Sequence, residues 1–206
     1  MIELFNGDCL TEMTKIPDSS VDFIYTDLPY ATTQNSWDIL IPMEPLWEQY
    51  NRVIKPNGCI ALWSQMPFSA KLVMSNPDDF RYEWIIEKSK GTGFLNAKRM
   101  PLKCHENVLI FYKKLPTYNP QKTTGHKPVH SYTKHTSDGT NYGSTKLISG
   151  GGSTERYPRD VLKFQWDTQK SAIHQPQKPV SAAEYFISTY TNEGDTVLDS
   201  CMGSGS

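Results

Sequence analysis

The fold of this protein is decided by residues 21–30, which read Val21-Asp22-Phe23-Ile24-Tyr25-Thr26-Asp27-Leu28-Pro29-Tyr30. The first six residues are almost continuously apolar, as in a parallel strand that is covered on both faces of its sheet. The last four place a carboxylate, a main-chain carbonyl and an aromatic ring at the carboxyl end of that strand, which is the edge where open α/β sheets bind ligands. A planar amine suits these groups, because the oxygens accept its N–H bonds while the tyrosine stacks on its ring.

Apolar periodicity on both sides of this stretch predicts an α/β sheet with crossover helices. Near the N-terminus we expect a short strand over residues 2–9 and a helix over residues 10–15. The further strands are expected at residues 59–63, 82–88, 106–112 and 196–199, and the further helices at 45–54, 67–74 and 180–190. Ordered structure is expected to resume at residues 161–164.

The composition describes a globular protein with one sizeable core. The chain has 206 residues and a net charge of −1, so any affinity for nucleic acid must come from local basic patches. The four cysteines are far apart, which favours reduced thiols over a zinc site or a disulfide framework. No apolar run approaches the roughly 20 residues of a membrane span, so we expect a cytoplasmic protein with no membrane partner and no metal.

A second motif stands at residues 196–205, which read Thr196-Val197-Leu198-Asp199-Ser200-Cys201-Met202-Gly203-Ser204-Gly205. A strand that ends in aspartate and continues into a small-residue loop is typical of a nucleotide-cofactor turn. Glycines let the backbone approach the ligand, and free N–H groups meet its carboxylate or phosphate. The alternatives are a structural loop or a cloned Gly-Ser linker for the last four residues. The candidate cofactor-binding residues in this loop are Asp199, Cys201, Met202, Gly203 and Gly205.

Together the two motifs resemble the β class of DNA amino-methyltransferases, in which an Asp/Asn/Ser-Pro-Pro-Tyr/Phe/Trp signature precedes the S-adenosylmethionine loop. Leu28 stands where that signature has its first proline. Gly7-Asp8-Cys9 matches the family's N-terminal turn near the cofactor adenine, and Gln177-Lys178-Pro179 matches the segment that opens the helix before the glycine loop. The resemblance implies a Rossmann-like S-adenosylmethionine-dependent methyltransferase sheet, mostly parallel, with helices on both faces.

The resemblance also implies roles for individual residues. Asp27 and the Leu28 carbonyl would hold both hydrogens of an exocyclic amine, whose nitrogen then attacks the sulfonium methyl in line. Tyr30 would stack on a base rotated out of the duplex. The implied catalytic residues are Asp27, Leu28, Pro29 and Tyr30. S-adenosylmethionine is the implied cofactor, and its site would include Asp8, Cys9, Asp27 and Lys178, with Lys178 meeting the cofactor carboxylate or a phosphate.

Residues 116–163 differ in character from the rest of the chain. Between Pro116 and Phe164, seven lysines and arginines stand against three acids, with tyrosines and histidines interleaved. This segment is too polar for a core of its own, so we predict a target-recognition insertion whose cations neutralise phosphates while aromatics touch bases. An ordinary solvated loop is the alternative. The candidate DNA-binding residues are Trp37, Asp38, Lys122, Lys127, Lys134, Arg156 and Arg159.

The predicted organisation is a catalytic half at residues 1–115, the insertion at 116–163, and the start of a cofactor-binding half at 164–206. In the resembled family, a further helix and further strands follow the glycine loop. The sequence leaves three hypotheses open: a portion of a longer protein, a natural truncation, or completion by a second chain or a homodimer. An exposed sheet edge gives the last hypothesis a physical basis.

The leading functional hypothesis is a site-specific DNA adenine-N6 methyltransferase of the restriction-modification type, with double-stranded DNA as its partner. Aspartate at the first position of the motif favours adenine, whereas serine would favour the nearest alternative, a cytosine-N4 methyltransferase. An alternative from another class is a catalytically inactive DNA-binding or assembly subunit with an incomplete cofactor pocket. A small-molecule or protein methyltransferase would leave the basic insertion without a purpose.

Overall fold

The computed structural model describes residues 1–32, 38–134, 148–165 and 177–203. Residue contacts divide the chain into two compact units, and each is described by itself. The sheet unit comprises residues 1–119 and 160–206, and the ribbon unit comprises residues 120–159. The ribbon unit lies inside the range predicted for the insertion, and residues 164–206 share one unit with residues 1–115.

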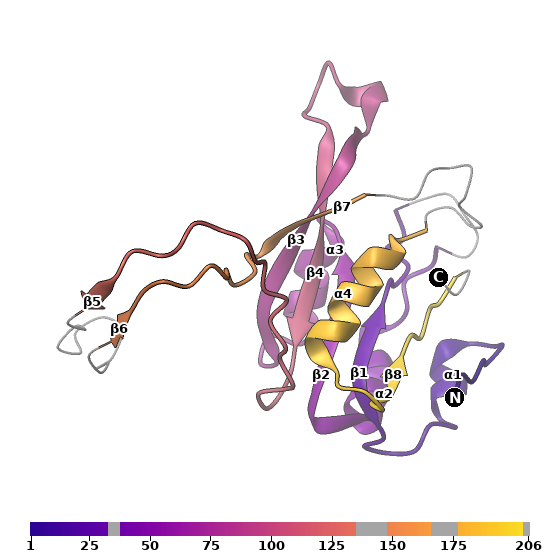
Figure 1. Ribbon diagram of the computed structural model, residues 1–206. Helices are drawn as coiled ribbons and strands as arrows, with labels where there is room; N and C mark the ends of the chain where they lie inside the picture. The colour runs from indigo at the N-terminus through magenta and orange to yellow at the C-terminus, as the bar shows by residue number, and fades with distance from the viewer. Residues whose placement is uncertain (33–37, 135–147, 166–176, 204–206) are drawn as a thin grey trace. The chain divides into compact units, whose positions relative to one another are not determined.

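The sheet unit is built on a six-stranded sheet with the order β7-β3-β4-β2-β1-β8 (Figure 1). Three of its five strand pairings are parallel, namely β1–β2, β1–β8 and β3–β7, while β2–β4 and β3–β4 are antiparallel. The prediction of a mostly parallel α/β sheet is therefore confirmed. The strands are β1 Val21–Thr26, β2 Ile54–Ser64, β3 Phe80–Thr92, β4 Lys103–Phe111, β7 Val161–Phe164 and β8 Val197–Leu198.

Helices cover both faces of this sheet, as predicted. Alternate residues of β1 point to opposite faces: Phe23 and Tyr25 pack with Phe186 of α4, whereas Ile24 packs with Leu46 of α2. In Figure 1, α4 lies on the near face and α2 and α3 lie behind the sheet. The helices are α1 Cys9–Met13, α2 Met43–Val53, α3 Phe68–Ser75 and α4 Val180–Tyr190, with a 3₁₀ turn at Phe94–Asn96. Within the described ranges, no helix combines the length and apolarity needed to cross a bilayer.

The strand predicted at residues 2–9 is wrong. Residues 1–6 form no regular structure, and Ile2 and Leu4 are exposed. A strand needs a hydrogen-bonding partner to offset the entropy of ordering its backbone. The strand at the nearby edge of the sheet, β8, is only two residues long. Asp8 instead caps α1, because its carboxylate accepts the Thr11 N–H at 3.1 Å.

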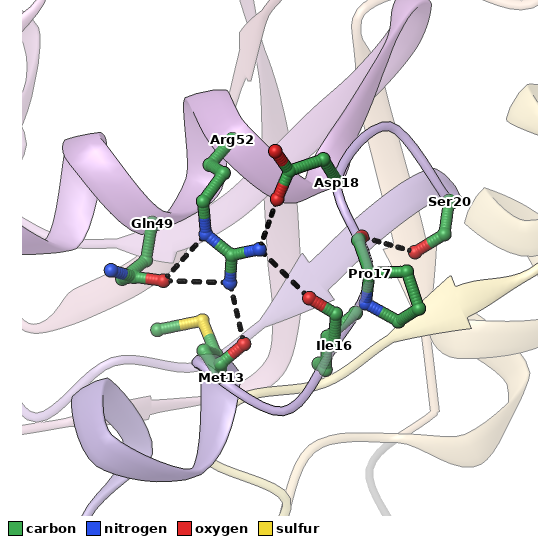
Figure 2. A network of polar contacts seen from close by, with 7 residues as sticks. All are labelled: Met13, Ile16, Pro17, Asp18, Ser20, Gln49 and Arg52. Atoms are coloured by element: carbon green, nitrogen blue, oxygen red, sulfur yellow. Dashed lines mark hydrogen bonds and ion pairs between the residues drawn. The ribbon is translucent and has the colours of Figure 1, made fainter.

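Arg52, near the end of α2, ties α1 and the segment before β1 to the body of the sheet unit (Figure 2). Its guanidinium donates to the carbonyls of Met13 and Ile16 at 2.7 and 2.8 Å, and to the carboxylate of Asp18 at 2.5 Å. Gln49 accepts two further bonds. The last carbonyls of a helix have no partner within the helix. Arg52 supplies one at the end of the short helix α1.

The ribbon unit is an extended antiparallel pair of chain segments that contains β5, Tyr132–Lys134, and β6, Ile148–Gly150. Main-chain hydrogen bonds continue the pairing beyond the strands, at Thr123 with Arg156 and at Val129 with Ser153. None of the side chains described in this unit is buried. The polar segment forms a ribbon without a core.

Candidate active site

The two motifs of the sequence lie side by side at one edge of the sheet. Strands β1 and β8 are parallel neighbours, with Ile24 opposite Leu198, so Asp27 and Asp199 both follow the carboxyl end of a strand. Thr26 Oγ1 donates to Asp199 Oδ1 at 2.6 Å, which joins the two strand ends directly. The fold therefore brings the predicted catalytic motif to the predicted cofactor loop.

A cavity of about 670 Å³, the strand-edge cavity, opens at this edge. Its volume lies within the range of about 300–1,000 Å³ that is usual for ligand sites. Both motifs contribute to the wall: Asp27, Leu28, Pro29, Tyr30, Asp199, Cys201, Met202 and Gly203. Among the described residues of the wall, four side chains are acidic and two are basic: Asp27, Asp38, Glu106 and Asp199, and Lys88 and Lys178. The described part of the wall therefore has more acidic than basic side chains.

Four of these groups form a row of alternating charge, the charge chain. Lys178 Nζ lies 3.2 Å from Asp27 Oδ2 and 2.7 Å from Glu106 Oε2. The other oxygen of Glu106 is paired with Lys88. Lys178 immediately precedes Pro179, which caps α4, and Glu106 lies in β4, so a helix start and a strand hold the chain in place. Side-chain exposure falls from 28% at Asp27 to 14% at Lys178 and 8% at Glu106.

Burial and charge oppose one another along the charge chain. Burial raises the pKa of Asp27, and Lys178 and the Tyr30 hydroxyl offset this only in part. Burial would also raise the pKa of Glu106, but its two lysines outweigh it and that pKa is lowered. The pKa of Lys178 is raised, because Asp27 and Glu106 outweigh burial. Of these three groups, Asp27 is therefore the one whose charged form is least stabilised.

Tyr30 and Leu28 face the site in different ways. The Tyr30 hydroxyl donates to Asp27 Oδ1 at 2.6 Å, and its ring stacks on Phe68 with centroids 5.0 Å apart. The Lys178 ammonium lies 5.6 Å from the centre of the same ring. The Leu28 side chain is buried in the core, so its main chain is the polar part that position 28 offers to the cavity.

The glycine loop after β8 is held from two sides. Asp199 Oδ1 accepts the Cys201 N–H at 2.9 Å, and burial raises the pKa of Asp199. The Ser200 hydroxyl is hydrogen-bonded to Tyr50 of α2 at 2.7 Å. Gly203 has a φ of +57°, a left-handed conformation that favours glycine. These contacts shape the loop that was predicted to bind the cofactor.

A second cavity of about 690 Å³, the N-terminal cavity, adjoins the strand-edge cavity. Phe5, Gly7, Asp199, Ser200 and Met202 line both.

The predicted Cys9 lines the N-terminal cavity, and its thiol is hydrogen-bonded to that of Cys201. This bond lowers the pKa of Cys9 to about 7, although burial opposes the shift. The predicted Asp8 is exposed and serves as the cap of α1.

The other predicted residues are more dispersed. Asp38 is 7% exposed, and its two carboxylate oxygens accept the N–H groups of Ala31 and Thr32, so it shapes the loop that follows Tyr30. Trp37 and Gly205 lie outside the described residues. The predicted basic residues Lys122, Lys127, Lys134, Arg156 and Arg159 all belong to the ribbon unit.

Two of these basic residues stabilise the ribbon itself. Lys122 pairs with Glu155 at 3.0 Å and lies over the Tyr157 ring, with 4.9 Å between Nζ and the ring centre. Arg156 donates to the carbonyl of Lys127 at 2.5 Å. Lys127 and Arg159 are exposed, and the side chain of Lys134 lies outside the described part.

Sequence reasoning missed Glu106 and Lys88. Glu106 opens an apolar stretch that reads as an ordinary strand, and only its acidic first residue hinted at a site. Strand β4 runs antiparallel to β2, so the start of β4 lies at the same sheet edge as the end of β2. Lys88 pairs with Glu106, and Glu87 pairs with Lys163. Among the described residues, no three His, Cys, Asp or Glu side chains cluster as metal ligands.

Comparison with known proteins supplies close parallels for this arrangement. The Type II methyltransferase M.BglII of Bacillus subtilis is 27% identical over 224 residues, covering 98% of this chain and 60% of that protein. The DNA adenine methyltransferase YhdJ of Escherichia coli (strain K12) is 25% identical, covering 98% of this chain and 71% of that protein. The chain spans about half the length of the Type II methyltransferase M.BamHI of Bacillus amyloliquefaciens.

Solved structures show the same fold. The M1.HpyAVI–SAM complex superposes with a TM-score of 0.60 at 20% identity, covering 100% of this chain and 85% of that chain. The cytosine-N4-specific PvuII DNA methyltransferase gives a TM-score of 0.64 at 13% identity. The match covers 94% of this chain and 71% of that chain. These likenesses confirm the predicted Rossmann-like methyltransferase fold. A family model described as DNA methylase, of the N6/N4 methyltransferases, matches residues 21–206, and the chain therefore belongs to that DNA amino-methyltransferase family.

Proposed function

We propose that this chain carries the catalytic site of a site-specific DNA methyltransferase that transfers a methyl group from S-adenosylmethionine to the N6 amine of a flipped adenine. The observation that carries the proposal is the position of Asp27. Its carboxylate is held between Lys178 and Tyr30, in a cavity that the Asp199 loop also lines. An acceptor for an amine and a loop for a nucleotide cofactor thus share one space.

The donor set of the cavity fits this cofactor. S-adenosylmethionine carries one net positive charge, and the described residues of the strand-edge cavity include two more acidic than basic side chains. When bound, it supplies a methyl group on a positively charged sulfur. Asp199 and the main chain of Cys201, Met202 and Gly203 would hold it, with Gly205, Asp8 and Cys9 as further predicted contacts. We propose Lys178 and Asp27 as the charged groups at the methyl-transfer end.

Asp27 retains the capacity to accept an amine. An ionised carboxylate offers about four lone-pair positions, and Tyr30 and Lys178 each use one. The Leu28 carbonyl would accept the second N–H of the amine. Positive charge develops on the nitrogen as it attacks, and a fixed carboxylate in a partly buried site stabilises that charge. Lys178 acts by keeping Asp27 ionised against the effect of burial.

Tyr30 would bind the face of the target base. Its ring already lies in an aromatic stack with Phe68, so it offers a rigid surface at the cavity wall. Methylation of a base inside a duplex requires the base to leave the stack, because the reacting amine is otherwise inaccessible. Pro29 fixes the backbone between the two functional residues.

Asp27 supports adenine rather than cytosine as the target. Aspartate heads the motif of the adenine enzymes in the family that the sequence resembles, and YhdJ, a relative matched over 98% of this chain, is named a DNA adenine methyltransferase.

The ribbon unit would read the surrounding sequence, with Lys127 and Arg159 as exposed cations beside Lys122, Lys134 and Arg156. Trp37 and Asp38 stay proposals for the wall of the base pocket. A cytoplasmic restriction-modification role belongs to the same proposal.

One assay tests the proposal. The protein is incubated with S-adenosylmethionine labelled in its methyl group and unmethylated plasmid DNA, and the digested DNA is analysed for the modified base. We expect N6-methyladenine. N4-methylcytosine would overturn the choice of base, and cofactor binding without transfer would favour an inactive DNA-binding subunit. Absence of both cofactor and DNA binding would contradict the whole proposal.

A further inference from the structure

The hairpin formed by β3 and β4 extends well beyond the sheet (Figure 1). We call its outer part, residues 88–105, the arm. Pairing along the hairpin becomes irregular between Glu87 and Thr92, and Thr92 then pairs with Lys103. Every residue from 89 to 105 is exposed, in contrast to the buried inner halves of both strands. The arm therefore adds nothing to the core of the sheet unit.

The arm is strongly basic. It contains five lysines and arginines and no aspartate or glutamate. Lys88, at its base, belongs to the charge chain. The four outer cations are all exposed: Lys90, Lys98, Arg99 and Lys103. A patch of like charge on a protein of nearly zero net charge attracts a polyanion locally.

The tip of the arm is apolar as well as basic. Phe94 is 80% exposed, Leu95 is 99% exposed and Met100 is 55% exposed. Gly93, with a φ of +87°, makes the turn into the 3₁₀ helix that carries the first two. Leaving large apolar side chains in water is unfavourable, so several of them exposed together commonly mark a binding surface.

The base of the arm forms part of the candidate active site. Lys88 and Thr92 line the strand-edge cavity, as does Glu106, which follows the arm in β4. Phe94 follows Thr92 by only two residues. A large substrate that reaches the cavity would therefore approach the base of the arm. An apolar tip surrounded by cations is the combination with which proteins insert into base steps while binding the flanking phosphates.

We propose that the arm is a second DNA-contacting element, separate from the ribbon unit, and that it helps to open the duplex at the target base. Phe94 and Leu95 insert beside the target base pair, and Lys90, Lys98, Arg99 and Lys103 bind phosphates around it. This inference rests on the proposed function, because an enzyme that modifies a base within a duplex must displace that base. It assigns part of the work of displacement to residues outside the catalytic motif.

The test compares a paired and a pre-opened substrate. One duplex contains the target sequence, located by mapping the methylated sites on the plasmid, and a second carries a mismatch opposite the target base. The double variant Phe94→Ala/Leu95→Ala should transfer methyl groups at least tenfold more slowly than wild type to the paired duplex. It should come within about threefold of wild type on the mismatched duplex, where unpairing costs less. Leu115→Ala, which removes an equally exposed side chain outside the arm, should match wild type on both.

The cations are tested by salt dependence. Lys98→Ala/Arg99→Ala should bind any duplex more weakly and should lower the slope of log affinity against log salt by about 2, one for each lost phosphate contact. The control Lys15→Ala/Lys71→Ala removes two cations outside the arm and should leave the slope unchanged.

Several results would overturn the inference. One such result is that Phe94→Ala/Leu95→Ala transfers methyl groups to the paired duplex at the wild-type rate. Another is that its transfer rate falls equally on both duplexes, which would indicate damage to the active site. A self-association of the wild type that the apolar variant abolishes would assign the tip to a protein contact. If the wild type transfers no methyl group, the proposed function fails, and an unchanged salt slope in the cation variant would then also remove the arm as a DNA contact.

Discussion

Strand β1 has an aspartate near each end, and each aspartate is paired with a lysine, yet the two pairs are built differently. Asp22, near the start of the strand, receives Lys55 Nζ on both oxygens at 2.7 Å, and its Oδ2 also accepts the Thr196 N–H. Asp27, just after the end of the strand, shares Lys178 with a second carboxylate. The Asp22–Lys55 pair involves one carboxylate and one ammonium group, whereas the Asp27–Lys178 pair belongs to the four-residue charge chain.

The difference shows how position in the sheet turns a common ion pair into a candidate catalytic group. The Asp22 pair joins the starts of three neighbouring strand regions. Among the described residues, neither Asp22 nor Lys55 lines the strand-edge cavity or the N-terminal cavity. The Asp27 pair lies at the carboxyl edge, where parallel strands leave room for a ligand. Burial raises the pKa of Asp27 there, and the cation beside it only partly compensates. Asp22 is expected to contribute stability, and Asp27 is expected to contribute chemistry at some expense of stability.

The largest expected effect is that of Asp27→Asn. This change keeps the shape of the side chain and removes the negative charge that faces the developing positive charge on the amine. We expect the transfer rate to fall at least about a thousandfold, which corresponds to about 4 kcal/mol in the activation barrier. The measurement is the single-turnover transfer rate with labelled S-adenosylmethionine.

The matched control is Asp22→Asn on the same strand, which should keep the wild-type rate within about threefold.

The thermal stability of Asp27→Asn gives a second comparison with wild type. Because the pKa of Asp27 is raised by folding, its protonated form is the one that folding favours, and stability is lost as the pH rises through the folded pKa. At pH 7 the Asn variant should therefore melt no lower than wild type. Equal losses of rate in both variants would contradict the distinction.

Glu106→Gln comes next, with an effect on stability. Removing this carboxylate leaves the Lys88 and Lys178 ammonium groups facing one another in a buried site. We expect the free energy of unfolding to fall by about 3 kcal/mol at pH 7, as measured by urea denaturation. The control Glu87→Gln breaks an exposed pair with Lys163 and should cost at most about 1 kcal/mol.

The pH dependence of the Glu106 effect has a definite sign. Folding lowers the pKa of Glu106, so the stabilisation is present above the unfolded pKa and is lost as the pH falls through the folded value. The difference in the free energy of unfolding between wild type and Glu106→Gln should therefore become smaller at acid pH. If this difference in the free energy of unfolding became larger at acid pH, the two lysines would not be holding Glu106 in its charged form.

Lys55→Met should have the smallest effect. Lys55 is 38% exposed, and a partly exposed ion pair contributes about 1 kcal/mol or less, so the melting temperature should fall only slightly. The transfer rate should not change. If Lys55→Met lost activity without losing stability, the ion pair at the start of β1 would contribute to the reaction. The two ends of the strand would then not differ in function.

The sequence predicted most of the fold because its signals are local. The apolar stretch of β1 and the periodic residues of α4 both form the expected elements, and the observed bounds of α4, Val180–Tyr190, are those predicted. The strand at residues 2–9 failed because apolar residues alone do not provide a pairing partner. The outer part of the β3–β4 hairpin was missed because its pairing depends on two segments that each read as polar loop.

The site was predictable only in part, for a related reason. Asp27, Tyr30 and Asp199 each follow an apolar strand in the sequence, so their place at one edge follows from a parallel arrangement. Glu106 precedes its strand and reaches the same edge only because β4 is antiparallel to β2. Asp38 was expected near DNA, and its bonds to the Ala31 and Thr32 amides are of a kind that sequence alone does not reveal.

We expect Lys178 to keep Asp27 charged for the reaction, and we expect no such role for Lys55. The most direct test is the dependence of the single-turnover rate on pH, measured for wild type, Lys178→Met and Lys55→Met with saturating S-adenosylmethionine and DNA. Without Lys178, the pKa of Asp27 should rise further, and the acid limb of the profile should move to higher pH by at least about one unit. The Lys55→Met profile should overlie that of wild type. An acid limb that stays in place in Lys178→Met, or that moves equally in both variants, would contradict the account.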